Sequence, residues 1–194
     1  MQEQNELASI AAEIMHCTKC PLHKSRKNAV PGEGNPNAKI MLIGEAPGYW
    51  EDIQGRPFVG AAGKLLESLL AEIGLKRQDV FICNILKCRP PKNREPQPNE
   101  ISACAPYLDR QINAIKPKLI ITLGNHSTAY VFSKAKIPFE GITKHRGKPY
   151  RTEILNKPIT VYPTFHPAAA LYNVKYKQAL TEDFRKLAQE ITKT

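Results

Sequence analysis

Residues 44–63 read GEAPGYWEDIQGRPFVGAAG, and the rest of the chain is interpreted from this stretch. It holds five glycines, two prolines and three carboxylates, and it lies between an apolar run at residues 39–43 and helical spacing from Gly63. A buried strand followed by such a loop and a helix is typical of open α/β sheets, which bind ligands at the carboxyl ends of their strands. The glycines would let the backbone approach a flat or anionic ligand, and Phe58 offers a stacking face. We therefore expect a ligand site here; the alternative is an irregular loop of ordinary turn residues.

Two common nucleotide-binding motifs do not fit this stretch. A dinucleotide-binding loop needs GxGxxG, which residues 44–48 do not supply. The sequence GAAGK at residues 60–64 resembles part of a phosphate-binding loop. However, Phe58 stands where that loop has its first glycine, and Leu65 stands where a Ser or Thr would bind magnesium. The sequence therefore excludes an NTPase of this type.

The chain is strongly basic. Its 194 residues include 28 Lys and Arg against 18 Asp and Glu, which gives a net charge of +10. This length is sufficient for one domain, 1–194, with its own core. The basic residues cluster in or beside predicted loops, a distribution that indicates a polyanionic partner such as nucleic acid. The clusters lie at residues 24–27, 87–94, 144–148 and 175–177.

The sequence also predicts where the protein works. No run approaches the roughly 20 apolar residues of a membrane helix, and residues 1–10 lack the basic and apolar parts of a signal peptide. We therefore expect a cytoplasmic protein with no membrane partner. Because cytoplasmic proteins rarely form disulfides, the five cysteines indicate metal or thiol chemistry.

Apolar runs alternate with amphipathic segments along the chain, which predicts a mostly parallel sheet covered by helices on both faces. The third predicted helix contains Pro106, which leaves its straightness open. Polar residues at the carboxyl ends of successive strands should converge at one edge of the sheet; they are Glu45, Asn84, Asn125 and His166. The predicted strands are 39–43, 80–85, 118–123, 149–155 and 159–164, and the main predicted helices are 5–15, 63–73, 101–115 and 175–191.

The cysteines suggest a metal centre. Cys17 and Cys20 form a CxxC pair, and Cys88 and Cys104 follow downstream. Four cysteines suit either zinc or a [4Fe–4S] cluster, and the absence of a second CxxC favours iron–sulfur. Cys83 alternates with apolar residues and is expected to be buried. The residues alone leave open whether Cys83 replaces Cys88.

Several motifs together resemble a family-four uracil-DNA glycosylase, the iron–sulfur type. They are GEAPGYWEDIQGRPFVGAAGKLL from Gly44, NILKCRPPKNREPQP from Asn84, HPAAAL from His166, and the set Cys17, Cys20, Cys88 and Cys104. The resemblance covers residues 17–171. It implies a three-layer α/β/α sandwich around a central, mostly parallel four-stranded sheet, with a [4Fe–4S] cluster on those four cysteines. It also implies an enzyme that flips uracil out of DNA and hydrolyses the N-glycosidic bond, leaving an abasic site.

The same resemblance assigns roles to individual residues. Phe58 would stack on uracil, Asn84 would pair with its N3–H and O4, and His166 would stabilise the charge that develops on O2. Glu45 would hold the attacking water. The remaining assignments are the backbone amides of Gly44, Glu45 and Ala46 as pocket lining, Glu51 as the group that blocks the thymine methyl, and Leu171 as the wedge in the DNA stack.

The chain departs from related families at two points. Ala46 stands where family-one enzymes have Asp, so water activation depends on Glu45 or on water held by the backbone. The loop at residues 89–98 has no His, whereas the covalent DNA-trapping relatives have a reactive one there. We therefore expect a monofunctional enzyme. We also expect it to be a monomer associated with the nucleoid and to act on uracil-containing DNA. A sliding clamp is a further candidate partner, although the sequence contains no recognisable clamp-binding peptide. The alternatives are a non-catalytic iron–sulfur nucleic-acid-binding protein and a metal-stabilised hydrolase of free nucleotides.

Overall fold

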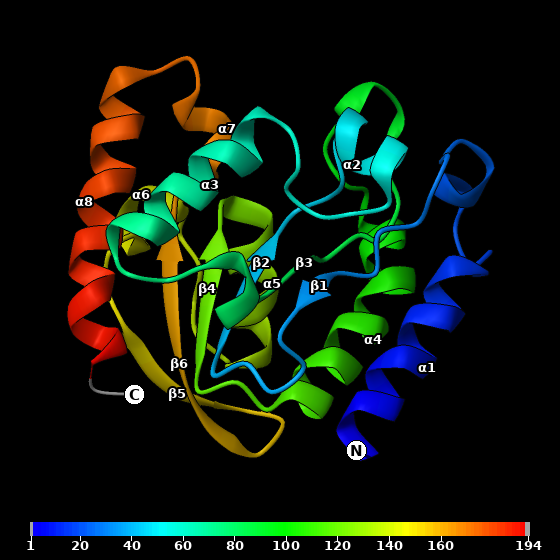
Figure 1. Cartoon of the computed structure of the whole chain (residues 1–194), viewed down its shortest axis with the longest axis horizontal. Coiled ribbons are helices and arrows are strands. Elements are labelled where there is room, and N and C mark those ends of the chain that lie inside the picture. The colour runs from blue at the N-terminus through cyan, green and yellow to red at the C-terminus, as the bar shows by residue number, and fades with distance from the viewer. Residues whose placement is uncertain (1, 193–194) are drawn as a thin grey trace.

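One mixed sheet organises the protein (Figure 1). The computed structural model describes residues 2–192, and within them the six strands run in the order β1-β3-β2-β4-β6-β5. The four central strands are parallel, and β1 and β5 pair antiparallel at the two edges. The predicted four-stranded parallel sheet is therefore the centre of a larger mixed sheet. The strands are β1 Glu33–Gly34, β2 Ile40–Gly44, β3 Phe81–Asn84, β4 Leu119–Leu123, β5 Tyr150–Ile154 and β6 Lys157–Thr164.

Helices cover both faces of the sheet, so the predicted three-layer α/β arrangement is confirmed (Figure 1). On one face, Leu66 of α3 and Phe184 of α8 belong to the same buried cluster as Leu42. On the other face, α4 and α5 pack against Met41 and Ile43. Alternate residues of β2 thus point to opposite cores, which is why the whole strand is apolar. The longer helices are α1 Gln2–Met15, α3 Ala61–Glu72, α4 Pro98–Ile115, α5 Asn125–Lys134 and α8 Val174–Ile191.

Two helices differ from the sequence-based expectation. Helix α4 begins at Pro98 because Glu100 accepts the Gln97 backbone N–H at 2.9 Å, a capping interaction, and it continues through Pro106. Pro106 is exposed, so water can reach the carbonyl group that its missing N–H leaves free. The second difference is α2 (Tyr49–Gln54), which lies within the stretch predicted to be a loop and ends at Gly55 with φ +67°.

The carboxyl edge of the sheet brings distant segments together. Gly44 pairs with Asn84 where β2 and β3 end, and Thr164 ends β6 just before His166. Two short helices flank this edge, α6 (Ile142–His145) and α7 (Pro167–Ala170). Among the described helices, none has the length and apolar composition needed to cross a membrane.

Candidate active site

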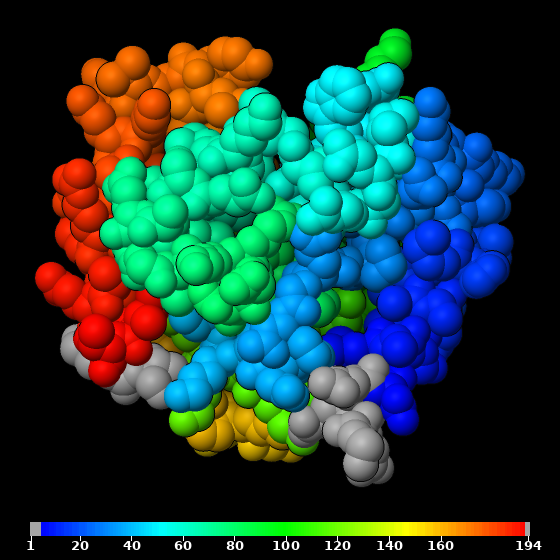
Figure 2. Space-filling model, in the orientation of Figure 1, coloured from blue at the N-terminus to red at the C-terminus, as the bar shows by residue number. Residues whose placement is uncertain are grey.

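A cavity of about 330 Å³ opens at the carboxyl edge of the sheet. This volume lies at the small end of pockets that bind small molecules, about 300–1,000 Å³. In Figure 2 the surface is notched between the cyan residues of α2 and the blue-green residues of α3, and both helices contribute to the cavity wall. The lining includes six of the predicted site residues: Glu45, Ala46, Glu51, Phe58, Asn84 and His166.

Asn84 carries an unused hydrogen-bond acceptor. Its side chain is 2% exposed, and among the described residues no group binds its Oδ1. Buried polar atoms normally have a partner, so an orphan atom on a residue that lines a cavity indicates a ligand. Gly44 makes this arrangement possible, because a Cβ there would overlap Asn84 Oδ1 and lie 2.7 Å from Phe58 Cζ. Gly44 itself is not among the lining residues, and the predicted role of its amide stays a prediction.

His166 presents a hydrogen-bond donor beside the aromatic ring of Phe58. Burial lowers the pKa of His166 to about 4, although Glu51 opposes this change, so the ring is neutral at pH 7. Its Nδ1 accepts the Ala168 backbone N–H at 3.1 Å, which leaves the proton on Nε2. The rings of His166 and Phe58 are nearly parallel, with centroids 5.6 Å apart. The cavity therefore combines a neutral N–H donor, an aromatic face and the Asn84 amide.

Glu45 is the carboxylate of this group. Burial raises its pKa, while His126 lowers it and Glu95 raises it. His126 Nε2 lies 3.9 Å from Glu45 Oε2, a contact that the sequence analysis did not anticipate. The only feature of the sequence that could have predicted this contact was the position of His126 just after β4, at the carboxyl edge of the sheet. Of the four polar residues expected to converge there, Asn125 does not line the cavity: its Oδ1 accepts the Ile142 N–H at 2.9 Å and is thus used in the structure.

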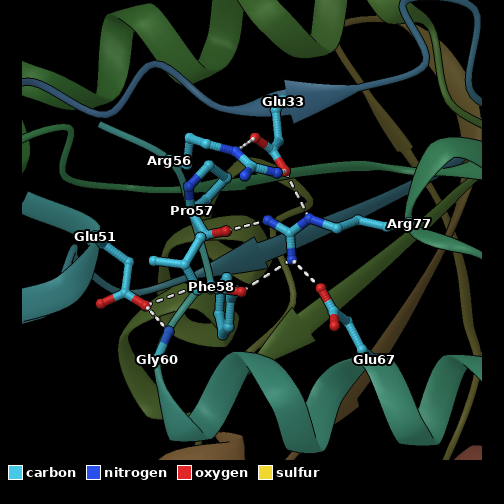
Figure 3. Close-up of polar contacts among 9 residues, drawn as sticks. Glu33, Glu51, Arg56, Pro57, Phe58, Gly60, Glu67 and Arg77 are labelled. Carbon is cyan, nitrogen blue, oxygen red and sulfur yellow. Dashed lines mark hydrogen bonds and ion pairs between the residues drawn. The ribbon is translucent and has the colours of Figure 1, made fainter. Parts of the chain in front are cut away.

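Glu51 lines the cavity and also supports its wall (Figure 3). Its Oε1 accepts the backbone N–H groups of Val59 at 2.8 Å and Gly60 at 2.9 Å. The carboxylate thereby holds the turn that carries Phe58 against the first residues of α3. Its predicted role in excluding thymine stays a prediction.

The loop after β3 closes another side of the cavity with Pro90, Asn93 and Arg94, which were not predicted as site residues. Arg94 is fixed by two hydrogen bonds to Glu100, at 2.9 and 2.5 Å. In the sequence, Arg94 was assigned to the basic cluster at residues 87–94, and Pro90 and Asn93 were marked only by the motif that begins at Asn84.

Two residues of the predicted basic clusters are buried or partly buried. Lys87 is 1% exposed, and its Nζ donates to the Asn84 carbonyl and to Gln111. Arg146 is paired with the buried Asp183 at 2.6 Å. Both residues belong to clusters that were expected to face a polyanion, but their charged groups bind other residues of the protein. Charge spacing alone could not reveal these partners.

Cys17, Cys20, Cys88 and Cys104 all line one small cavity beneath α1 and α4. Arg26 Nη1 lies 2.9 Å from Cys88 Sγ, and the Lys87 backbone N–H donates to Cys104 Sγ at 3.2 Å. Burial raises the pKa of the Cys104 thiol to about 12. Cys83 lies elsewhere, in the core between the sheet and α4. As the side chains stand, no three Cys, His, Asp or Glu residues within 2–192 are grouped to hold a single metal ion.

Comparison with known proteins identifies the family. The sequence model of the uracil DNA glycosylase superfamily matches residues 31–190. The chain belongs to this superfamily. It is 58% identical over 189 residues to a type-4 uracil-DNA glycosylase of Saccharolobus solfataricus, covering 97% of this chain and 88% of that protein. A type-4 uracil-DNA glycosylase of Archaeoglobus fulgidus is 48% identical over 183 residues, 94% of this chain and 92% of the relative.

Similarity to another branch of the superfamily is more limited. A type-5 uracil-DNA glycosylase of Thermus thermophilus is 36% identical over 110 residues, which are 49% of this chain and 50% of the relative. A type-5 relative from Pyrobaculum aerophilum aligns over 80% of this chain but is only 27% identical, whereas the two type-4 relatives combine 48–58% identity with nearly complete coverage. The protein is thus a member of the type-4 branch, as its motifs predicted.

Proposed function

We propose that the protein is a monofunctional uracil-DNA glycosylase, with residues 1–194 acting as one domain. The observation that carries the proposal is the unpaired Asn84 Oδ1 beside the neutral His166 and the Phe58 ring. These groups complement uracil, which has an N3–H donor, a flat face and an O2 acceptor. The type-4 uracil-DNA glycosylases that cover nearly all of this chain support the same activity.

Selectivity for uracil over cytosine would come from Asn84. Its Oδ1 would accept the N3–H of uracil, and its amide group would donate to O4. Cytosine has no proton on N3 and carries an amino group in place of O4, so the buried amide would stay unpaired. Sites of this kind reject the wrong ligand strongly. Glu51 is our candidate for excluding the 5-methyl group of thymine.

Cleavage would depend on charge stabilisation at both ends of the glycosidic bond. His166 would donate its Nε2–H to O2 as negative charge develops on the leaving base. Glu45, whose pKa burial raises, would orient the attacking water and stabilise positive charge on the sugar. His126 lies close enough to Glu45 to influence this charge. No lysine is among the described residues that line the cavity, which supports direct hydrolysis by water.

We further propose that Cys17, Cys20, Cys88 and Cys104 hold a [4Fe–4S] cluster. Zinc needs four ligands that converge on one point, whereas each iron of the cluster takes one cysteine. The four thiols line one cavity, where each could bind a different iron of the cluster. The buried Lys87 donates its Nζ hydrogens to two uncharged oxygens, and Arg26 contacts Cys88. Both cations would be stabilised by the thiolates of a bound cluster. When bound, the cluster would join the segment after α1 to the loop after β3.

Uracil-containing DNA is the proposed partner. Leu171 follows α7 and is 36% exposed, which suits a wedge that fills the gap left by the flipped base. We also propose that the enzyme works as a monomer near the nucleoid. A sliding clamp is the protein partner to test, in a binding assay with the purified clamp.

The function can be tested with a labelled oligonucleotide that contains one uracil, followed by alkaline cleavage at abasic sites. We expect cleavage at the uracil position only after incubation with the protein. An oligonucleotide with cytosine at that position should stay intact. Binding of DNA without cleavage would favour the non-catalytic alternative. Turnover of free deoxyuridine nucleotides, with uracil in DNA left intact, would favour the nucleotide hydrolase.

A further inference from the structure

Phe58 has a backbone conformation that bulky side chains rarely adopt. Its φ is +51°, in the left-handed region, although the residue is only 5% exposed. Such a residue keeps this conformation only where the surrounding structure holds it. The contacts of residues 57–60 therefore decide where the Phe58 ring lies in the cavity.

One side chain, Arg77 of η2 (Arg77–Asp79), holds the carbonyl side of this turn (Figure 3). Its Nη1 donates to the Phe58 carbonyl at 2.9 Å, and its Nη2 donates to the Pro57 carbonyl. Its Nε donates to Glu33 Oε1 at 2.6 Å. A guanidinium presents its donors in a rigid plane, so it fixes the two carbonyl groups relative to each other and to β1.

The amide side of the turn is held separately. Glu51 accepts the N–H groups of Val59 and Gly60, and α3 packs so closely that a Cβ at Gly63 would overlap the Phe58 carbonyl. Arg77 reaches the turn from a segment beyond α3, and its side chain is 17% exposed. It is not among the residues that line the cavity, so any effect on a ligand must act through the turn.

From these contacts we infer that Arg77, oriented by Glu33, is a positioning residue that holds the Phe58 ring for stacking on the flipped-out base. The identity of that base rests on the proposed function. Without the guanidinium, the carbonyl groups of residues 57 and 58 lose their donors, and Phe58 can return to negative φ. The ring then leaves the cavity wall. Burial would raise the pKa of Glu33, but hydrogen bonds from Arg56 and Arg77 lower it. Glu33 and Arg77 therefore both carry their charges at neutral pH.

The first test compares Arg77→Met with Arg56→Met. Arg56 also binds Glu33, at 2.7 Å to Oε2 and 3.1 Å to Oε1, but its side chain is 57% exposed, so it is a matched control. The measurement is the inhibition of uracil excision by free uracil, which reports occupancy of the pocket independently of DNA contacts. We expect Arg77→Met to weaken inhibition by about tenfold, the scale of losing one base–aromatic stack. Arg56→Met should leave it unchanged. Equal inhibition constants for the parent and Arg77→Met would overturn the inference.

The second test separates positioning from general destabilisation. If Arg77 acts through Phe58, Arg77→Met should have no further effect on uracil inhibition in a Phe58→Ala background, because coupled residues are not additive. Fully additive losses would show that Arg77 acts by another route. Glu33→Gln keeps the carbonyl contacts of Arg77 but weakens its orientation, so it should give a smaller loss. It serves as the second variant should Arg77→Met fold poorly.

A third measurement does not depend on catalysis. The backbone ¹³C chemical shifts of Phe58 report its φ, and they can be recorded in all variants whether or not the parent excises uracil. We expect left-handed values in the parent and Arg56→Met, and a shift toward ordinary values in Arg77→Met. Unchanged Phe58 shifts in Arg77→Met would overturn the positioning role. A parent that releases no uracil would instead contradict only the proposed function.

Discussion

Replacing Asn84 by Leu should make the ligand-free protein more stable while it destroys activity. Asn and Leu have similar shapes, but Leu brings no polar atom to the position where Oδ1 is buried without a partner. The side chain is 2% exposed and lies between the close-packed Gly44 and the cavity. The native residue therefore lowers the free energy of unfolding until a ligand binds.

The size of the effect follows from the cost of an unpaired buried acceptor, about 1–3 kcal/mol. For a protein of this length, that corresponds to an increase of about 2–12 °C in Tm. Saturating free uracil should close this difference in stability, and it should reverse the order where the gain of Asn84→Leu is below the ligand's contribution. At about 100 times its Kd it would stabilise the parent by about 2.7 kcal/mol, and it should not stabilise Asn84→Leu at all.

The assay is unfolding of matched parent and variant preparations, with and without uracil, together with single-turnover excision. Asn125→Leu is the control, because Asn125 also follows a parallel strand but its Oδ1 binds the Ile142 N–H at 2.9 Å. It should lose about 0.5–1.5 kcal/mol of stability and keep its activity. An Asn84→Leu variant that is less stable than the parent, or that still excises uracil, would refute the reasoning.

Three further outcomes are expected. His166→Ala should slow single-turnover excision by about 100-fold, as for other losses of a transition-state donor, while DNA affinity in a filter-binding assay stays at the parental value. The pH–rate profile should have an acid limb that lies above the usual pKa of a glutamate, because burial raises the pKa of Glu45, while His166 is protonated only near pH 4. Activity should therefore rise with pH through the Glu45 pKa, and an acid limb that persists in Glu45→Gln contradicts this assignment. Cys88→Ser should lose iron and visible absorbance and Cys83→Ser should keep both, which elemental analysis of anaerobically purified protein decides.

The parallel centre of the sheet could be predicted because its strands are buried on both faces. Residues 40–44 and 119–123 are apolar except for Thr122, and such runs between amphipathic segments have few other interpretations. β1 could not be predicted in this way, since two residues carry no periodic pattern. Its existence depends on pairing with β3, which is a long-range contact.

Within the site, motifs predicted the residues whose side chains meet the ligand cavity but not those that support them. Phe58, Asn84 and His166 lie in recognisable stretches, and the structure brings all three to one cavity. His126 contacts Glu45 only because β4 and β2 are neighbours in the sheet. Lys87 belongs to a basic run, yet its burial follows from the packing of α4 over the sheet.

The Phe58 turn illustrates why supporting residues escape a reading of the sequence. A positive φ at a phenylalanine contradicts local preference, so no local pattern predicts it. It is stabilised by Arg77, 19 positions further along the chain, and by Glu33, which precedes β2. Each of these charged residues alone would be expected on a solvated surface. Only the fold brings them to the same turn, where the buried carbonyl groups need donors and the guanidinium needs an anion. The strain at Phe58 therefore persists because the surrounding residues are bound in the same arrangement that positions the ring.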